Sequence, residues 1–306
     1  MNPAWSVILF TTIAGAGQGL YLALVAAHAF DAAPARFLVA GAAIAVILLG
    51  AGLVSSMFHL GHPERGWRSA AMWRTSWLSR EVIVLPTFMA AMFAWGVALH
   101  LGISRETILW LGALGVLLAI ALFVCTGMIY ACLPFLQEWR SPLTVVNYIA
   151  LGCASGTTLA AALAAGLHPP LARAFALAAL AIGAFAYISR LASLARNARL
   201  RPRSTLATAI GVKHPKIAQI SQGAMGGSFN TREFFHGRPR EVVRAARWML
   251  LALVFPVPAL LLASGSQSVG VLAAAFAAQY AGLLAERWYF FAEAKHPQNL
   301  YYQAIS

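Results

Sequence analysis

The stretch from Trp248 to Ala285 reads WMLLALVFPVPALLLASGSQSVGVLAAAFAAQYAGLLA and contains no charged side chain. A helix needs about 20 apolar residues to cross the hydrocarbon core of a bilayer, so this stretch is long enough for two crossings. The polar run Ser264-Gly265-Ser266-Gln267-Ser268 in its middle supplies the turn between them. The stretch therefore predicts a pair of transmembrane helices.

The rest of the chain has the same character. Of its 306 residues, 60% are hydrophobic and only 10% are charged, and the mean hydropathy is +0.73. A soluble domain carries roughly 25% charged residues. Backbone polar groups in lipid need internal partners, so continuous apolar runs of this length must be helices. We expect an all-α, polytopic membrane bundle of eight transmembrane helices that forms a single domain over residues 1–306. The expected spans are residues 4–29, 37–58, 82–101, 107–131, 143–166, 171–195, 245–263 and 268–291.

Basic residues are distributed unevenly over the predicted loops. With eight spans, both termini share a side with the loop 59–80 and with a long loop at about 200–243, and this side holds most of the arginines and lysines. The opposite side has only Arg36, Arg105 and Arg173. The positive-inside rule therefore predicts that both termini and these loops are cytoplasmic. The net charge of +13 indicates anionic lipid and an acidic protein partner rather than nucleic acid, because no nucleic-acid-binding motif accompanies it.

The segment from Met57 to Glu81 is the one most suggestive of chemistry. It places His59 and Glu81 at the same predicted membrane interface, on adjacent helices. A quinone needs hydrogen-bond partners for its ring oxygens and a path for two protons; histidine can supply the first, and a partly buried carboxylate can relay protons. Arg74 and Arg80 are close enough in sequence to influence the carboxylate or to stabilise semiquinone charge. These residues predict a quinone site.

Two segments could dock a protein partner. Trp67 and Arg68 lie in the same loop, although tryptophan and arginine are also ordinary at a membrane interface. The long loop at about 200–243, with Arg232 and Arg238, is either a solvated connection or a docking surface, and the sequence leaves both open. Cys125, Cys132 and Cys153 match no iron–sulfur or zinc spacing, so we expect no metal site in this chain.

The runs Ser56-Met57-Phe58-His59-Leu60-Gly61-His62-Pro63, with Arg65 after it, and Ser76-Trp77-Leu78-Ser79-Arg80-Glu81 resemble the membrane anchor subunit of the dimethyl sulfoxide reductase family. The resemblance extends to the eight-helix layout and to the C-terminal run Glu286-Arg287-Trp288-Tyr289-Phe290-Phe291. It implies a haem-free anchor in a bacterial inner membrane that binds ubiquinone or menaquinone through His59 and Glu81, with Arg65 close by.

The resemblance also implies partners. In that family the anchor holds an iron–sulfur subunit with four clusters, which connects to a molybdopterin catalytic subunit. Because the basic side of this chain carries the predicted quinone-site loop, the anchors of cytoplasmic sulfite-oxidising complexes are the more similar branch. The resemblance thus favours a sulfite:quinone oxidoreductase over a dimethyl sulfoxide reductase that oxidises menaquinol.

Two other functions compete with this hypothesis. A haem b anchor needs pairs of histidines deep in the bilayer, whereas the histidines here fall near predicted helix ends or in loops. A secondary transporter often has broken helices, and Pro256-Val257-Pro258 should kink the seventh span. Glu286 and Arg287 could serve a partner interface or a proton path. As sequence neighbours they are not expected to form a helical salt bridge, and Arg190 is expected to reach out to the interface.

Overall fold

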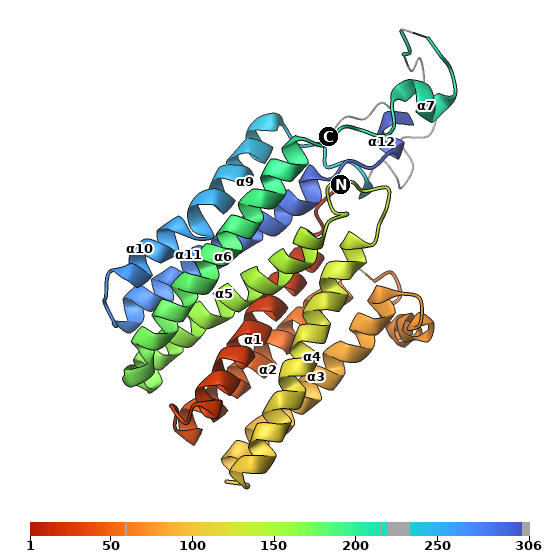
Figure 1. Cartoon of the computed structure of the whole chain (residues 1–306). Helices are drawn as coiled ribbons and strands as arrows, with labels where there is room; N and C mark the ends of the chain where they lie inside the picture. The colour runs from red at the N-terminus through yellow and green to blue at the C-terminus, as the bar shows by residue number, and fades with distance from the viewer. Residues whose placement is uncertain (59, 215, 219–232, 302–306) are drawn as a thin grey trace.

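The structure is a computed structural model that describes residues 1–58, 60–214, 216–218 and 233–301. Within these residues, eight segments are long and apolar enough to span a membrane, as the sequence predicts, and the arrangement is entirely helical. Figure 1 shows them as one elongated bundle. The spans are α1 (Trp5–Ala29), α2 (Ala35–Met57), α3 (Trp77–His100), α4 (Arg105–Ala131), α5 (Pro142–Leu167), α6 (Ala172–Ala198), α9 (Arg240–Leu253) with α10 (Pro256–Ala263), and α11 (Val269–Glu293). The short elements are η1 (Pro63–Met72), η2 (Pro169–Leu171), α7 (Leu206–Ile210) and α12 (Gln298–Tyr301).

Serine caps explain where several helices begin. The side-chain oxygen of Ser76 accepts a hydrogen bond from the backbone N–H of Ser79 at 3.3 Å, and Ser104 and Ser268 cap α4 and α11 in the same way. Such a cap satisfies one of the N–H groups that a helix leaves free at its start. α3 therefore begins at Trp77 rather than at the predicted residue 82. Glu81 consequently lies inside the helix and not at its edge.

The centre of the bundle is a close crossing of α1 and α5. Each helix carries two glycines four residues apart, Gly15 and Gly19 on α1 and Gly152 and Gly156 on α5. A Cβ atom added to Gly19 or Gly156 would overlap the backbone of the other helix. This small-xxx-small pattern allows van der Waals contact between backbones, which is a main source of helix association in lipid. α2, α3 and α4 lie on one side of this pair, and α6 and α9–α11 lie on the other (Figure 1).

The seventh span is broken, as the prolines predict. α9 ends at Leu253 and α10 begins at Pro256. Pro258 has no N–H to donate to the carbonyl of Val254, and Gln279 of α11 donates to that carbonyl instead at 3.2 Å. The hydroxyl of Tyr187 donates to the carbonyl of Leu251 at 3.1 Å. Neighbouring helices thus satisfy carbonyls that the break frees, as lipid requires.

Both ends of the described chain lie at one end of the bundle, which we call the terminal end (Figure 1). It also carries η1, the α4–α5 loop and α7. The described part of the long loop packs on the C-terminal tail: Asn299 donates to the carbonyl of Phe234 at 2.8 Å, and the rings of Phe234 and His296 stack at 3.8 Å. The predicted grouping of the basic loops at one end is therefore confirmed for the described residues.

Candidate functional site at the start of α3

Glu81 is a carboxylic acid held inside the bundle. Its side chain is only 5% exposed, one turn into α3. The hydroxyl of Thr126, near the end of α4, donates a short hydrogen bond to its Oε1 atom. No ion pair joins Glu81 to an arginine or lysine in the part of the chain that the structure describes. A buried carboxyl group with a hydroxyl partner and no cation is suited to hold and release a proton.

Arg80 fixes the loop that leads into α3. Its Nε and Nη2 atoms donate to the carbonyls of Trp73 and Arg74 at 2.9 and 2.8 Å, and its guanidinium lies 4.2 Å from the centre of the Trp77 ring. The guanidinium therefore faces the loop rather than Glu81. Its structural effect is to hold residues 73–77 against the start of the helix.

Among the described residues, the other side chains predicted for the quinone site do not share the buried surroundings of Glu81. Arg65 is exposed and lies 3.8 Å from Glu64, and the guanidinium of Arg74 lies 5.4 Å from the ring centre of Trp73 at the surface. His59 lies outside the described residues. The structure thus brings Arg80, at the start of α3, into contact with the carbonyl of Arg74 in the preceding loop. Of the described residues predicted for the quinone site, it buries only Glu81.

The predicted docking residues are exposed where they are described. Trp67 is 73% exposed, and the guanidinium of Arg68 lies 5.5 Å from its ring centre. Arg238 is exposed, and its backbone N–H donates to Nδ1 of His236 at 3.0 Å. Arg232 lies outside the described residues. η1 has no buried side chain, so its face is free in the isolated chain.

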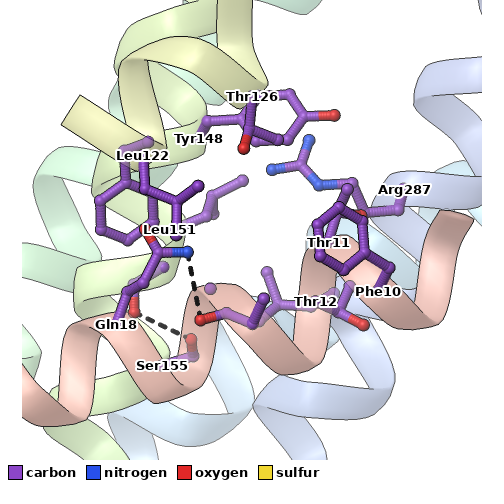
Figure 2. Close-up of a pocket in the computed structure, with 15 residues that line it drawn as sticks. Phe10, Thr11, Thr12, Gln18, Leu122, Thr126, Tyr148, Leu151, Ser155 and Arg287 are labelled. Atoms are coloured by element: carbon purple, nitrogen blue, oxygen red, sulfur yellow. Dashed lines mark hydrogen bonds between the residues drawn. The ribbon is translucent and has the colours of Figure 1, made fainter. Parts of the chain in front are cut away.

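A cavity with mainly apolar walls and a few polar groups lies behind Thr126, between α1, α4, α5 and α11 (Figure 2). We call it the inner cavity; its volume is about 20 Å³. In Figure 2, Thr126, Tyr148 and the guanidinium of Arg287 converge at one end, and Gln18 and Ser155 lie at the other. Sequence reasoning missed Thr126, because one threonine in an apolar span has no distinctive pattern.

An ionic cluster lies next to this cavity. Glu286 is 1% exposed, and its two oxygens lie 2.9 Å from Nε of Arg190 and 3.1 Å from Nη1 of Arg287. Two expectations from the sequence are therefore wrong: Arg190 is 3% exposed rather than interfacial, and Glu286 does pair with its neighbour Arg287. The spacing rule describes Cβ directions on a helix surface. A long arginine side chain in a dry interior can bend back to the nearest carboxylate.

A second cavity, the outer cavity, lies on the other side of the cluster. Its volume is about 10 Å³, and Arg287 lines both cavities. Arg287 also lies over the ring of Tyr148, 3.7 Å from its centre. The outer cavity reaches the terminal end at the half-buried Glu138 and Asn197. Its remaining lining residues are Thr144, Asn147, Arg190, Ser193, Glu286 and Phe290.

Comparison with known proteins identifies the architecture. Residues 1–302 match the family described as the DMSO reductase anchor subunit, DmsC. This chain belongs to that family. Over an alignment of 329 residues that covers 100% of both chains, it is 52% identical to a sulfite dehydrogenase subunit of Allochromatium vinosum. It is 27% identical to the anaerobic dimethyl sulfoxide reductase chain YnfH of Escherichia coli over 167 residues, 52% of this chain and 57% of that one.

Membership of this family confirms the prediction of a multi-pass membrane anchor subunit. The matched region extends through α11, so it contains both the start of α3 and the ionic cluster. Histidines among the described residues lie in the last turns of α1 and α3 or outside the spans, which is the distribution expected from the sequence.

Proposed function

We propose that this chain is the membrane anchor and quinone-reactive subunit of a complex that oxidises sulfite. The observation that carries the proposal is the buried Glu81–Thr126 pair at the membrane end of an exposed, arginine-rich loop in a chain of the anchor family. The 52% identity to a sulfite dehydrogenase subunit over the full chain supports sulfite as the source of electrons.

In this proposal, partner subunits outside the membrane carry out the oxidation of sulfite. A molybdopterin subunit oxidises sulfite, a four-cluster iron–sulfur subunit transfers the electrons, and the anchor delivers them to ubiquinone or menaquinone. The exposed face of η1, with Trp67 and Arg68, supports docking of the iron–sulfur subunit at the terminal end. Aromatic and arginine side chains are enriched in the centres of protein interfaces.

The cytoplasmic side of the bacterial inner membrane is the proposed location of the terminal end. The basic loops that this end carries support the assignment through the positive-inside rule. A reporter enzyme fused after Ser306 should be active only in its cytoplasmic form. Activity of a periplasmic reporter at the same position would contradict the assignment.

Residues of this chain have specific roles in the proposed reduction of quinone. The quinone, when bound, accepts two electrons. Glu81 gives a proton to a ring oxygen, and Thr126 keeps the carboxyl group oriented. We also propose His59, Arg65, Arg74 and Arg80 for the quinone site. The contacts of Arg80 support a positioning role, because they hold the loop that ends at Glu81.

Glu81→Gln tests this function. The variant keeps the size of the side chain but cannot cycle a proton, so sulfite-dependent reduction of decylubiquinone should fall about 100-fold or more. Reduction of ferricyanide should stay intact, because this dye meets the catalytic partner directly. The matched control is Glu106→Gln, which changes an exposed carboxylate in the first turn of α4 and should leave both activities unchanged. Full quinone reduction by Glu81→Gln would refute the assignment, as would a complex that handles dimethyl sulfoxide and not sulfite.

A further inference from the structure

The inner and outer cavities form two compartments separated by Arg287. The inner cavity ends at Thr126, the hydrogen-bond partner of Glu81, and the outer cavity ends at Glu138 and Asn197 at the terminal end. A polar cavity holds a water molecule when it offers about 10–15 Å³ or more and several polar partners. The volumes of about 20 and 10 Å³ are on that scale.

Several buried polar atoms in the walls of these cavities have no hydrogen-bond partner among the described residues. At the inner cavity, Oε1 of Gln18 is buried without such a partner. At the outer cavity, Oδ1 of Asn147 and Oε2 of Glu138 also lack a hydrogen-bond partner. Buried polar atoms are nearly always hydrogen-bonded, to ordered water where protein offers nothing. Both cavities therefore have the walls of water sites.

We propose that the two cavities form a proton-uptake route from the terminal end of the bundle to Glu81. The proposal rests on the proposed quinone-reducing function, because that reaction consumes protons. The route begins at Glu138 and Asn197, passes the carboxylate of Glu286, and reaches Glu81 through the hydroxyl of Thr126. The threonine hydroxyl donates to Glu81 and can accept from water in the inner cavity at the same time.

The chemistry balances with the proposed partners. One quinone takes two electrons from the iron–sulfur subunit and two protons from the protein, and becomes a quinol. Glu81 loses a proton to a ring oxygen and is reprotonated through Thr126 from water in the inner cavity. A proton from the outer cavity then replaces the one that this water has given up. A quinone bound against Glu81 covers the side of the carboxyl group that faces away from the inner cavity. Protons delivered from the inner cavity can therefore still reach Glu81 during turnover.

The arginines do not block such a route. An isolated arginine in a narrow pore repels a proton. Here Glu286 lies between Arg190 and Arg287 and offsets one of the two charges. Glu138 faces the outer cavity beside this cluster, Tyr148 lies under Arg287, and Glu293 accepts a hydrogen bond from Asn197 at 3.1 Å. Three carboxylates therefore accompany the two arginines along the route.

Asn147 offers the sharpest test, because it lines the outer cavity and is separated from Glu81 by the inner one. Asn147→Leu fills the outer cavity with methyl groups, whereas Asn147→Ser leaves room for water. In the complete complex with sulfite and decylubiquinone, we expect Asn147→Leu to lower turnover about tenfold, which is less than the roughly 10²–10⁴-fold contribution of a complete proton transfer, because the variant slows proton supply without removing Glu81. KM for decylubiquinone should stay constant, the loss should grow as pH rises, and the solvent deuterium isotope effect should increase. Asn147→Ser should behave as the parent protein.

A second variant and a control keep the test decisive. Glu286→Gln removes the carboxylate that lines the outer cavity beside Arg287, and it should show the same loss and the same isotope effect. Ser189→Ala removes a buried hydroxyl of α6 that lines neither cavity, and it should change nothing. Parental rates and pH profiles in both Asn147→Leu and Glu286→Gln, with Glu81→Gln inactive, would overturn the route and leave the proposed function standing. An active Glu81→Gln would instead overturn the proposed function.

Discussion

Arginines at the terminal end and arginines inside the bundle have opposite surroundings. At the terminal end, Arg68 and Arg74 lie over tryptophan rings in an exposed loop, and Arg65 is near Glu64 at 3.8 Å. Inside, Arg190 and Arg287 are 3% and 4% exposed and share one carboxylate. The surface groups keep bulk water as an alternative partner, whereas the interior groups have only the few waters that two small cavities can hold. The same residue type therefore contributes little to the stability of the fold in one place and is indispensable to it in the other.

The largest effect should come from breaking the interior cluster. Glu286→Ala leaves two buried guanidiniums without their counter-ion, and loss of one partner from a buried ion pair costs about 3–5 kcal/mol. Glu64→Ala removes the exposed carboxylate and should cost under about 1 kcal/mol. Thermal unfolding of the purified complex measures both. Equal losses in the two variants would show that the interior cluster is hydrated like the surface.

The sequence predicts the fold better than it predicts this contrast. Continuous apolar runs locate all eight spans, because length and hydropathy are sufficient for a helix in lipid. Pro256 and Pro258 locate the break, since the missing N–H is a property of the residue itself. The start of α3 is missed by five residues, because the Ser76 cap lies outside the apolar window.

The interior polar groups are harder to predict, because their partners are distant in sequence. Glu81 is recognisable as a carboxylate at a membrane interface, but nothing in the sequence connects it to Thr126, 45 residues later. Arg190 and Glu286 are 96 residues apart and meet only because α6 and α11 flank α5. The spacing rule therefore described the Glu286–Arg287 pair incorrectly, and the position of Arg190 near a helix end wrongly indicated the membrane interface. A helix-packing arrangement has to be known before such pairs can be assigned.

An intermediate loss of stability is expected at the break between α9 and α10, because the buried polar side chain there, Gln279, is uncharged. Gln279→Leu leaves the carbonyl of Val254 without its partner in lipid, at a cost of about 1–3 kcal/mol. Pro258→Ala restores a backbone N–H that can reach the same carbonyl. Combining the two changes should therefore recover about 1 kcal/mol relative to the sum of the single variants. Thermal unfolding of the four proteins gives this coupling. Strict additivity would mean that Gln279 does not compensate for the proline.

The smallest effect should come from protonation at the terminal end. Partial burial lowers the pKa of His296 below its ordinary value of 6.5. Its Nδ1 accepts the backbone N–H of Gln298 at 3.2 Å, and its ring stacks on Phe234. The folded state thus favours the neutral ring, so its contribution to tail packing is complete above about pH 6.5 and is lost as pH falls below that value toward the lowered pKa.

Hydrogen exchange of residues 294–301 measures this change. Exchange corrected for its intrinsic pH dependence should rise between pH 6.5 and 5, by less than about tenfold, the factor for one pKa unit. His296→Phe keeps an aromatic ring against Phe234 and cannot be protonated, so its corrected exchange should not vary with pH. His62→Phe, which changes an exposed histidine near η1, should retain the parental dependence. If His296→Phe also retained it, the pH response would belong to another group at this end, with the half-buried His236 the first to replace, because burial also lowers its pKa.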